Sequence, residues 1–346
     1  MTAAVEVHED VAEIPDWDDL MGASGAPVFY SSAFLTAYRK AELLPADAYA
    51  YLMLRDADGS PRAALPATLM PRMDPAGSLA VYEPGIAARP LGLVSHAWHC
   101  YDSLLPVRRG EGDLPAVIAV LEAFRGLAAE YAAPWYGLVN VDATGPLAGA
   151  LTRIGAHGVP IDERYVLDLP PGFGLSDYLA GLSGRHRYTM RAHRRRAAAA
   201  GAVVRVLAPE AADLDAHLRL VRLVGEKHGV ADYYPRGGYQ DLQLGLGPAA
   251  RVVEVTLAGR LVGAAACLLD AQRLHFWACG VDYAAAPTFS PFYVLFYEVL
   301  RHAIELGVSR FECGRRNGVF KRRYGLRPVP LLAYVSPTGR ALGARA

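Results

Sequence analysis

Residues 310–328 read Arg310-Phe-Glu-Cys-Gly-Arg-Arg-Asn-Gly-Val-Phe-Lys-Arg-Arg-Tyr-Gly-Leu-Arg-Pro328. This stretch predicts a short strand, a glycine-flanked basic turn, one helical turn carrying Phe320 and Lys321, and a Gly-x-x-Pro ending. Its nine central residues hold five cations: Arg315, Arg316, Lys321, Arg322 and Arg323. Only three of the 35 basic residues of the chain are lysines. Lysine is a compact point charge with a readily shifted pKa, so its presence in an arginine cluster indicates a chemical role. A solvated basic loop is the alternative.

Composition places the chain among ordinary globular proteins. Its 346 residues are 53% hydrophobic and 20% charged, which predicts one large domain or two smaller ones. The acidic N-terminus does not resemble a signal peptide, and no run of about 18 apolar residues predicts a membrane span. The four cysteines, at positions 100, 267, 279 and 313, form no C-x-x-C pair. They are typical of reduced thiols in a cytoplasmic protein, without a disulfide framework or a zinc site.

The net charge of zero hides an asymmetry between the two halves of the chain. Residues 1–160 hold 10 basic and 19 acidic residues, a net charge of −9, and residues 161–346 hold 25 and 16, a net charge of +9. We take these two ranges as the predicted domains. The second domain is expected to meet an anion, or the opposite charges serve to attract the two domains to each other.

Local patterns predict alternating helices and strands in both halves. In the first half we expect a helix within residues 27–40 with Ser31 or Ser32 as its N-cap, a hairpin of 49–55 with 63–70, a helix at 114–132, a strand at 135–141, and irregular chain at 74–113. In the second half we expect strands at 164–169, 203–207, 251–257, 261–269, 273–281, 310–313 and 329–335, and helices at 175–182, 185–200, 210–228, 235–246 and 291–306. Each half places a hairpin before a long helix and a strand.

A basic helix is the second candidate site. Arg187, Arg191, Arg194 and Arg195 are spaced i, i+4, i+7 and i+8, which places them on one helical face. Like charges at this spacing repel by a few tenths of a kcal/mol per pair, and a face that tolerates the repulsion is typical of phosphate binding. The alternative is a solvated face that acidic residues of the other half partly neutralise.

Candidates for other catalytic groups are sparse. His228 ends a helix in a polar, aromatic stretch and is a candidate general base, or else a partner of the helix dipole. Cys313 has no defined histidine partner that would make it a nucleophile. His96 and His99 have the wrong spacing for a metal-binding pair on a helix, so we predict no metal site and a packed aromatic segment there.

Several stretches together resemble a known family. They are Tyr178-Leu-Ala-Gly-Leu-Ser-Gly-Arg-His-Arg-Tyr-Thr-Met-Arg191, the helix at 290–307, Phe311-Glu-Cys-Gly-Arg315, Val319-Phe-Lys-Arg-Arg-Tyr-Gly325 and, in the first half, Phe29-Tyr-Ser-Ser-Ala-Phe-Leu35. This order resembles the GNAT superfamily in its double-domain Fem-type branch of peptidyl and aminoacyl transferases, over most of residues 165–335 and more loosely over 27–155. The resemblance implies an α/β (α+β) fold of two tandem GNAT-like domains, each with a mixed, mostly antiparallel sheet flanked by helices.

The resemblance also implies a function. Fem-type members move an acyl group from aminoacyl-tRNA to an amine, which implies transfer here to an amine or hydroxylamine of a small metabolite or peptide precursor. Phe320 and Lys321 match the pair that lies near the reacting ester. Arg187 and Arg191 would face phosphate, and Arg194, Arg195, Arg315 and Arg316 are further candidates for phosphate contacts. No bound cofactor is expected, tRNA is the expected partner, and the chain would be a monomer or a homodimer.

Two features distinguish this chain from relatives. The stretch Asp282-Tyr-Ala-Ala-Ala-Pro-Thr-Phe-Ser-Pro291 lacks the glycine-rich turn with which many GNAT acyltransferases bind the pyrophosphate of coenzyme A at a helix N-terminus. No segment between residues 170 and 250 matches the helical arm that some Fem-type members use for tRNA. An acyl-CoA-dependent N-acyltransferase and a non-catalytic binding protein on the same fold remain the alternatives.

Overall fold

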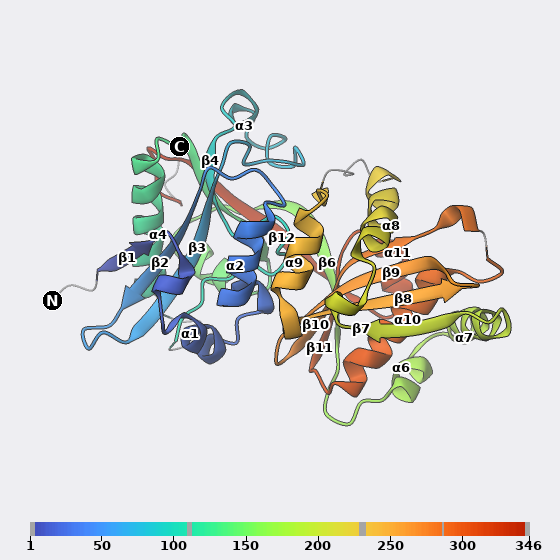
Figure 1. Cartoon of the computed structure of the whole chain (residues 1–346). Helices are drawn as coiled ribbons and strands as arrows, with labels where there is room; N and C mark the ends of the chain where they lie inside the picture. Colours follow the sequence, from blue (N-terminus) through green and yellow to red (C-terminus); the bar gives the residue numbers. More distant parts are fainter. Residues whose placement is uncertain (1–3, 109–112, 228–232, 286, 343–346) are drawn as a thin grey trace. The chain divides into compact units, whose positions relative to one another are not determined.

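Two compact units make up the chain, and each is described by itself. The computed structural model describes residues 4–108, 113–227, 233–285 and 287–342. Unit 1 comprises residues 1–163 and 329–346, and unit 2 comprises residues 164–328 (Figure 1). The sequence analysis assigned residues 329–346 to the second domain. The structure groups them with unit 1 instead, because the last strand pairs antiparallel with a strand of unit 1.

Unit 1 is built around a mixed sheet with the strand order β1-β2-β3-β4-β5-β12. Neighbouring strands are antiparallel except for β4 and β5, which are parallel. The strands are β1 (Val5–His8), β2 (Ala48–Arg55), β3 (Pro61–Met70), β4 (Gly92–Ser95), β5 (Trp135–Asp142) and β12 (Arg327–Pro337). The helices are α1 (Trp17–Ser24), α2 (Ser32–Ala41), α3 (Gly85–Ala88), α4 (Leu114–Glu130) and α5 (Pro146–Arg153).

Alternation along β2 assigns its two faces to different helices. Ala50, Leu52 and Leu54 join the core beneath α4, whereas Tyr51 points the other way and packs edge-on against Trp17 of α1 at 5.8 Å between ring centroids. The predicted N-cap of α2 is confirmed, because the Ser31 hydroxyl accepts a hydrogen bond from the amide of Phe34 at 3.1 Å.

Unit 2 repeats this topology with the strand order β6-β11-β10-β9-β8-β7. Here β10 and β11 form the parallel pair, and the other neighbours are antiparallel. The strands are β6 (Val159–Asp168), β7 (Val203–Leu207), β8 (Ala250–Leu257), β9 (Arg260–Leu269), β10 (Arg273–Val281) and β11 (Arg310–Arg315). The helices are α6 (Leu175–Gly181), α7 (Gly184–Ala199), α8 (Leu214–Lys227), α9 (Gly238–Gly245), α10 (Pro291–Glu305) and α11 (Gly318–Arg323).

The sheet of unit 2 is covered on both faces. Helix α10 packs on β8, β9 and β10 over a core that contains Val253, Ala265 and Phe296. Helix α8 packs on β10 so closely that a Cβ atom on Gly280 would lie 2.1 Å from the backbone of Leu220. In both units an antiparallel meander leads into a parallel pair joined by a long helix. The predicted fold class, two domains with mixed and mostly antiparallel sheets flanked by helices, is therefore confirmed.

The described part of the chain holds no helix that is both long and apolar enough to cross a lipid bilayer.

Candidate functional site

The basic stretch begins where two parallel strands of unit 2 stop pairing. Strand β10 pairs with β11 only over residues 273–275 and 310–312, although both strands continue beyond that point. Ligand sites in sheets of this kind gather at the carboxyl ends of parallel strands. Strand β11 then ends in a turn in which Gly314, Arg316 and Asn317 all have a left-handed backbone, with φ of 64°, 65° and 53°. The turn leads directly into α11.

Lys321 lies buried at this strand end, with 4% of its surface exposed. Its Nζ donates hydrogen bonds to the backbone carbonyls of Gly314 at 3.0 Å and Arg315 at 2.7 Å. The single turn of α11 therefore folds the lysine back over the end of β11 that precedes it. Two fixed carbonyls hold the ammonium in one place, which a solvated loop lysine would not show.

The ring of Tyr165 of β6 packs against α11. The Lys321 Nζ and the Arg322 guanidinium each lie 5.3 Å from the centre of its ring. A Cβ atom on Gly318 would lie 2.1 Å from the phenol oxygen of Tyr165, so only glycine allows the helix to start this close to the ring. Gly318 and Tyr165 together set the distance between α11 and the sheet.

Two thiols lie within the electrostatic reach of Lys321. Burial raises the pKa of Cys313 to about 11 and that of Cys279 to about 12, and the Lys321 ammonium lowers the pKa of both. Both thiols therefore carry their protons at neutral pH. A protonated thiol is a poor nucleophile, so neither cysteine is prepared to act as one.

Phe320 belongs to an aromatic cluster beside the lysine. It stacks on Tyr324 at 4.4 Å between ring centroids and packs edge-on against Phe292 at 4.8 Å and Phe296 at 5.2 Å. Phe320 is half-buried. The cluster joins α11 to α10 and fixes the orientation of the helix that carries Lys321.

A buried ion pair lies under the same strand end. Arg164 of β6 donates to the Glu312 carboxylate of β11 at 2.7 Å, and both side chains are almost completely buried. The pair lies one residue before Tyr165 on β6 and one before Cys313 on β11. It stabilises the two strands that support α11, provided that both charges stay paired.

The four arginines predicted on α7 have different roles in the structure. Arg187 donates to the carbonyls of Leu179 and Ala180, which end α6. Arg194 pairs with Glu298 at 2.8 Å and lies over the ring of Tyr297. Arg191 and Arg195 are exposed, and Arg195 lies over the ring of Tyr188 at 5.7 Å. Arg194 is exposed as well but is paired, so of the four arginines Arg191 and Arg195 are the ones that are both exposed and outside any ion pair given for the described chain.

One backbone amide at the start of α10 is bonded to a side chain. His193 of α7 accepts a hydrogen bond from the amide of Ser290 at 3.0 Å through Nδ1, and its ring stacks on Tyr293 at 4.5 Å. Burial, with help from Arg196, lowers the pKa of His193, which keeps the ring neutral and able to accept. The next residue, Pro291, has no amide hydrogen. Two of the backbone positions with which a helix N-terminus could bind a pyrophosphate therefore have no hydrogen to offer here.

Of the remaining predicted residues, two lie in the turn beside Lys321 and one lies outside the described chain. Arg315 donates to the hydroxyl of Tyr233 at 2.9 Å, and Arg316 is exposed in the left-handed turn. His228 lies outside the described residues. Within the described chain no group of three or more His, Cys, Asp or Glu residues could hold a metal ion.

Sequence reasoning missed Tyr165, His193 and the Arg164–Glu312 pair. His193 could have been found from the sequence, because it lies three residues after the apolar Met190. This spacing places both side chains on the face of α7 that packs on α10. No sequence pattern marked Tyr165 or Arg164, since their roles arise from pairing between strands that are distant in the sequence.

Comparisons with known proteins agree with this geometry. Residues 184–322 match the model of the acetyltransferase (GNAT) domain family. The structure is similar to that of FemX, with a TM-score of 0.62 and 11% identity over 96% of this chain and 97% of that one. It is also similar to a tandem GNAT protein from the clavulanic acid biosynthesis pathway, with a TM-score of 0.55 and 14% identity over 97% and 99% of the two chains. A third similar structure is L-PGS from Bacillus licheniformis, with a TM-score of 0.55 and 13% identity over 94% and 93%.

At these identities the solved structures show a shared fold, and the family match shows a GNAT domain in unit 2. The predicted resemblance to Fem-type proteins of the GNAT superfamily is confirmed at this level. No curated protein matches the sequence.

Proposed function

We propose that this acyltransferase of the GNAT fold moves an aminoacyl group from aminoacyl-tRNA to an amine or hydroxylamine of a small metabolite or peptide precursor. The observation that carries the proposal is the start of α10, where His193 already accepts the Ser290 amide hydrogen and Pro291 supplies none, so two of the backbone positions that could donate to a pyrophosphate do not. A donor that does not place its phosphates there fits this chain better than acyl-CoA does.

The reaction needs few groups from the protein. The acceptor nitrogen attacks the carbonyl carbon of the aminoacyl ester, and a tetrahedral oxyanion forms. When the intermediate collapses, the ester C–O bond breaks, the ribose oxygen leaves with a proton that came from the acceptor nitrogen, and an amide remains. Lys321 would offset the oxyanion charge, because its ammonium is held in place by two carbonyls before the reaction begins.

The aromatic cluster and the exposed arginines would hold the donor. The exposed part of Phe320 offers a surface on which a terminal base can stack. Arg191 and Arg195 offer charge for backbone phosphates on the exposed face of α7. Arg187 and Arg194 would act indirectly, by fixing α6 and α10 to this helix.

A tRNA-binding measurement tests the role of the α7 surface. Replacing Arg191 and Arg195 together by glutamine should weaken tRNA association and reduce the slope of log K against log salt by about 1 to 2, since about one phosphate contact is lost per arginine. The matched control replaces Arg219 of α8 and Arg236, two exposed arginines outside this surface. An equal loss in both double variants would contradict a specific role for α7.

The alternative is an acyl-CoA-dependent N-acyltransferase on the same fold. It is favoured by the description of the matching family as an acetyltransferase domain. In that case the coenzyme would have to bind without the amide of Ser290. Turnover with acetyl-CoA that is insensitive to ribonuclease would establish this alternative.

A further inference from the structure

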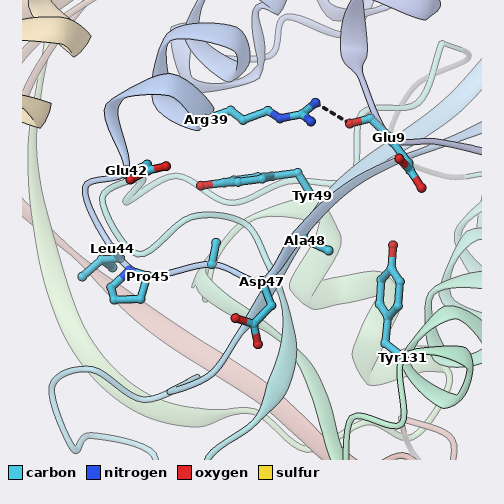
Figure 2. A pocket seen from close by; sticks show the side chains of 10 residues that line it. Glu9, Arg39, Glu42, Leu44, Pro45, Asp47, Ala48, Tyr49 and Tyr131 are labelled. Atoms are coloured by element: carbon cyan, nitrogen blue, oxygen red, sulfur yellow. Dashed lines mark hydrogen bonds between the residues drawn. The ribbon is translucent and has the colours of Figure 1, made fainter.

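Unit 1 contains a hollow of about 720 Å³ that shares no residue with the candidate site. It forms where the chain after β1, the end of α2, the loop into β2 and the end of α4 meet (Figure 2). The residues that line it are Glu9, Arg39, Glu42, Leu44, Pro45, Ala46, Asp47, Ala48, Tyr49 and Tyr131. A volume of this size accommodates a small organic molecule.

Carboxylates dominate the charge of the hollow. Its wall carries three acidic side chains, Glu9, Glu42 and Asp47, against one basic side chain, Arg39. The Arg39 Nη1 donates to the backbone carbonyl of Glu9 at 2.7 Å and lies 3.5 Å from the carboxylate of Asp10, which is not part of the lining. In the described parts of the chain, none of the three lining carboxylates forms an ion pair. The wall therefore has an excess of negative charge.

Two phenol rings complete the lining. Figure 2 shows Tyr49 between the side chains of Arg39, Glu42 and Asp47, with Tyr131 on the opposite side of Ala48. Across the residues that the structure describes, neither phenol hydroxyl has a hydrogen-bond partner. Burial raises the pKa of Tyr49 to about 12 and Glu42 adds to the rise; burial followed by Glu9 and Glu130 also raises the pKa of Tyr131. Burial is the main cause at both rings, and a lining carboxylate adds to the rise at each.

Tyr49 already has a cation near its ring. The guanidinium carbon of Arg39 lies 6.0 Å from the ring centroid, at the outer limit for a cation–π contact. The ring is thus compatible with a guanidinium or an ammonium beside it, and a ligand cation would find the same attraction together with the free carboxylates.

We propose that this hollow binds an organic cation, namely a primary ammonium or guanidinium group carried on an aliphatic chain. A bare metal ion does not fit, because the described residues contain no group of three or more acidic, His or Cys side chains that could hold one. An anion is disfavoured by the three carboxylates. An aliphatic chain would lie along Leu44 and Pro45 while its charged end meets the carboxylates and the Tyr49 ring. Free polyamines and the side chains of lysine or arginine in a peptide share this chemistry.

Calorimetric titration of the full chain with 1,6-diaminohexane tests the proposal, with 1,6-hexanediol as the neutral probe of the same length. The diamine should bind and the diol should not. Replacing Glu42 by Gln and Asp47 by Asn together should weaken diamine binding by about tenfold, since two carboxylate contacts with the ammonium groups are lost. The control double variant replaces Glu83 and Glu122 by glutamine, two exposed acidic residues of unit 1 outside the hollow, and should bind as the parent does.

Three outcomes would overturn the proposal: no diamine binding, equal binding of the diol, or equal weakening in the two double variants, which would reduce the effect to the general negative charge of unit 1. If the hollow variant does not fold, the ring resonances of Tyr49 and Tyr131 in the parent protein decide. They should shift with the diamine, and unchanged resonances contradict the site. Titrations with spermidine and with a tri-lysine peptide then identify the source of the cation. Tighter binding of spermidine indicates a free polyamine, and tighter binding of the peptide indicates a lysine side chain.

Discussion

Lys321 differs from the other lysines of the chain in its surroundings. Lys40 and Lys227 are exposed, whereas Lys321 is buried and bound to two backbone carbonyls. Burying an ammonium is costly unless it is hydrogen-bonded. The β11 turn supplies those bonds, and this distinguishes Lys321 from the two exposed lysines.

Replacing Lys321 by alanine should lower turnover by about 100-fold or more, because a preorganised charge at the oxyanion is lost. Added methylammonium should restore part of the activity, which a purely structural role would not allow. Lys40→Ala is the matched control and should retain parental turnover. Near-normal turnover of a folded Lys321→Ala variant would rule out the catalytic role, and Lys321→Met provides a second variant if the alanine variant is unstable.

His96 makes the stability of unit 1 depend on pH. Its ring is buried, Nε2 donates to the carbonyl of Phe29 at 2.7 Å, and burial lowers the pKa from 6.5 to about 4. Between pH 6.5 and 4 the unfolded chain binds a proton at this site and the folded chain does not. Stability should therefore fall as the pH falls through this window, by up to about 3 kcal/mol.

Denaturant unfolding of the parent and of His96→Gln at a series of pH values measures this effect. Between pH 4 and 6.5 the free energy of unfolding should change less with pH in the variant than in the parent. Above pH 7 the two proteins should show the same dependence on pH. Identical slopes for both proteins below pH 6.5 would contradict the assignment.

At the scale of single residues, the sequence showed where basic side chains gather but not which groups they contact. The arginine spacing on α7 is helical as expected, yet Arg187 and Arg194 bond to α6 and α10. Which arginine stays free depends on the helices packed around α7, and periodicity within one helix carries no such information.

At the scale of helices and strands, glycines mark the places where two elements pack most closely. A Cβ on Gly280 of β10 would lie 2.1 to 2.3 Å from the backbone of Leu220 and Val221 in α8. Backbone atoms cannot move aside as the end of a flexible side chain can. In contrast, a Cβ on Gly126 of α4 would meet no atom within 4 Å.

These two positions give opposite predictions for the same substitution. Gly280→Ala should destabilise the protein by about 1 to 3 kcal/mol or more, since α8 must shift from the sheet. Gly126→Ala should stabilise it by about 0.5 to 1 kcal/mol, because alanine is the better residue within a helix. Chemical denaturation measures both, and a neutral Gly280→Ala would contradict the close packing of α8 on β10.

The long elements and some short ones, such as β7 and α6, were predictable from sequence, but the four-residue strands β1 and β4 were not. The hairpin of β2 and β3 and the helices α4, α7 and α10 lie within a few residues of their predicted bounds, because their periodic patterns extend over eight or more residues. Strands β1 and β4 have four residues each, and β4 lies in the glycine- and proline-rich segment predicted as irregular. Such strands exist through their pairing partners, which a local pattern cannot reveal. The same reason explains why β12 belongs with β5 of unit 1.

At the scale of the whole molecule, the charge follows the two units of the fold. With the structural boundaries, unit 1 contains 12 basic and 21 acidic residues, a net charge of −9, and unit 2 contains 23 and 14, a net charge of +9. The negative unit carries the hollow proposed for a cation, and the positive unit carries Lys321 and the exposed arginines of α7. Each unit thus has a charge that suits the ligand proposed for it.

The most direct test of the central claim is the choice of acyl donor. Total tRNA charged with radiolabelled amino acids is incubated with the protein and the low-molecular-weight fraction of the source cells, and labelled amide products are measured. In parallel, the donor is replaced by labelled acetyl-CoA, and each reaction is repeated after ribonuclease treatment. We predict product from aminoacyl-tRNA alone, abolished by ribonuclease and by Lys321→Ala. Product formed from acetyl-CoA that survives ribonuclease, with none from aminoacyl-tRNA, would contradict the proposal.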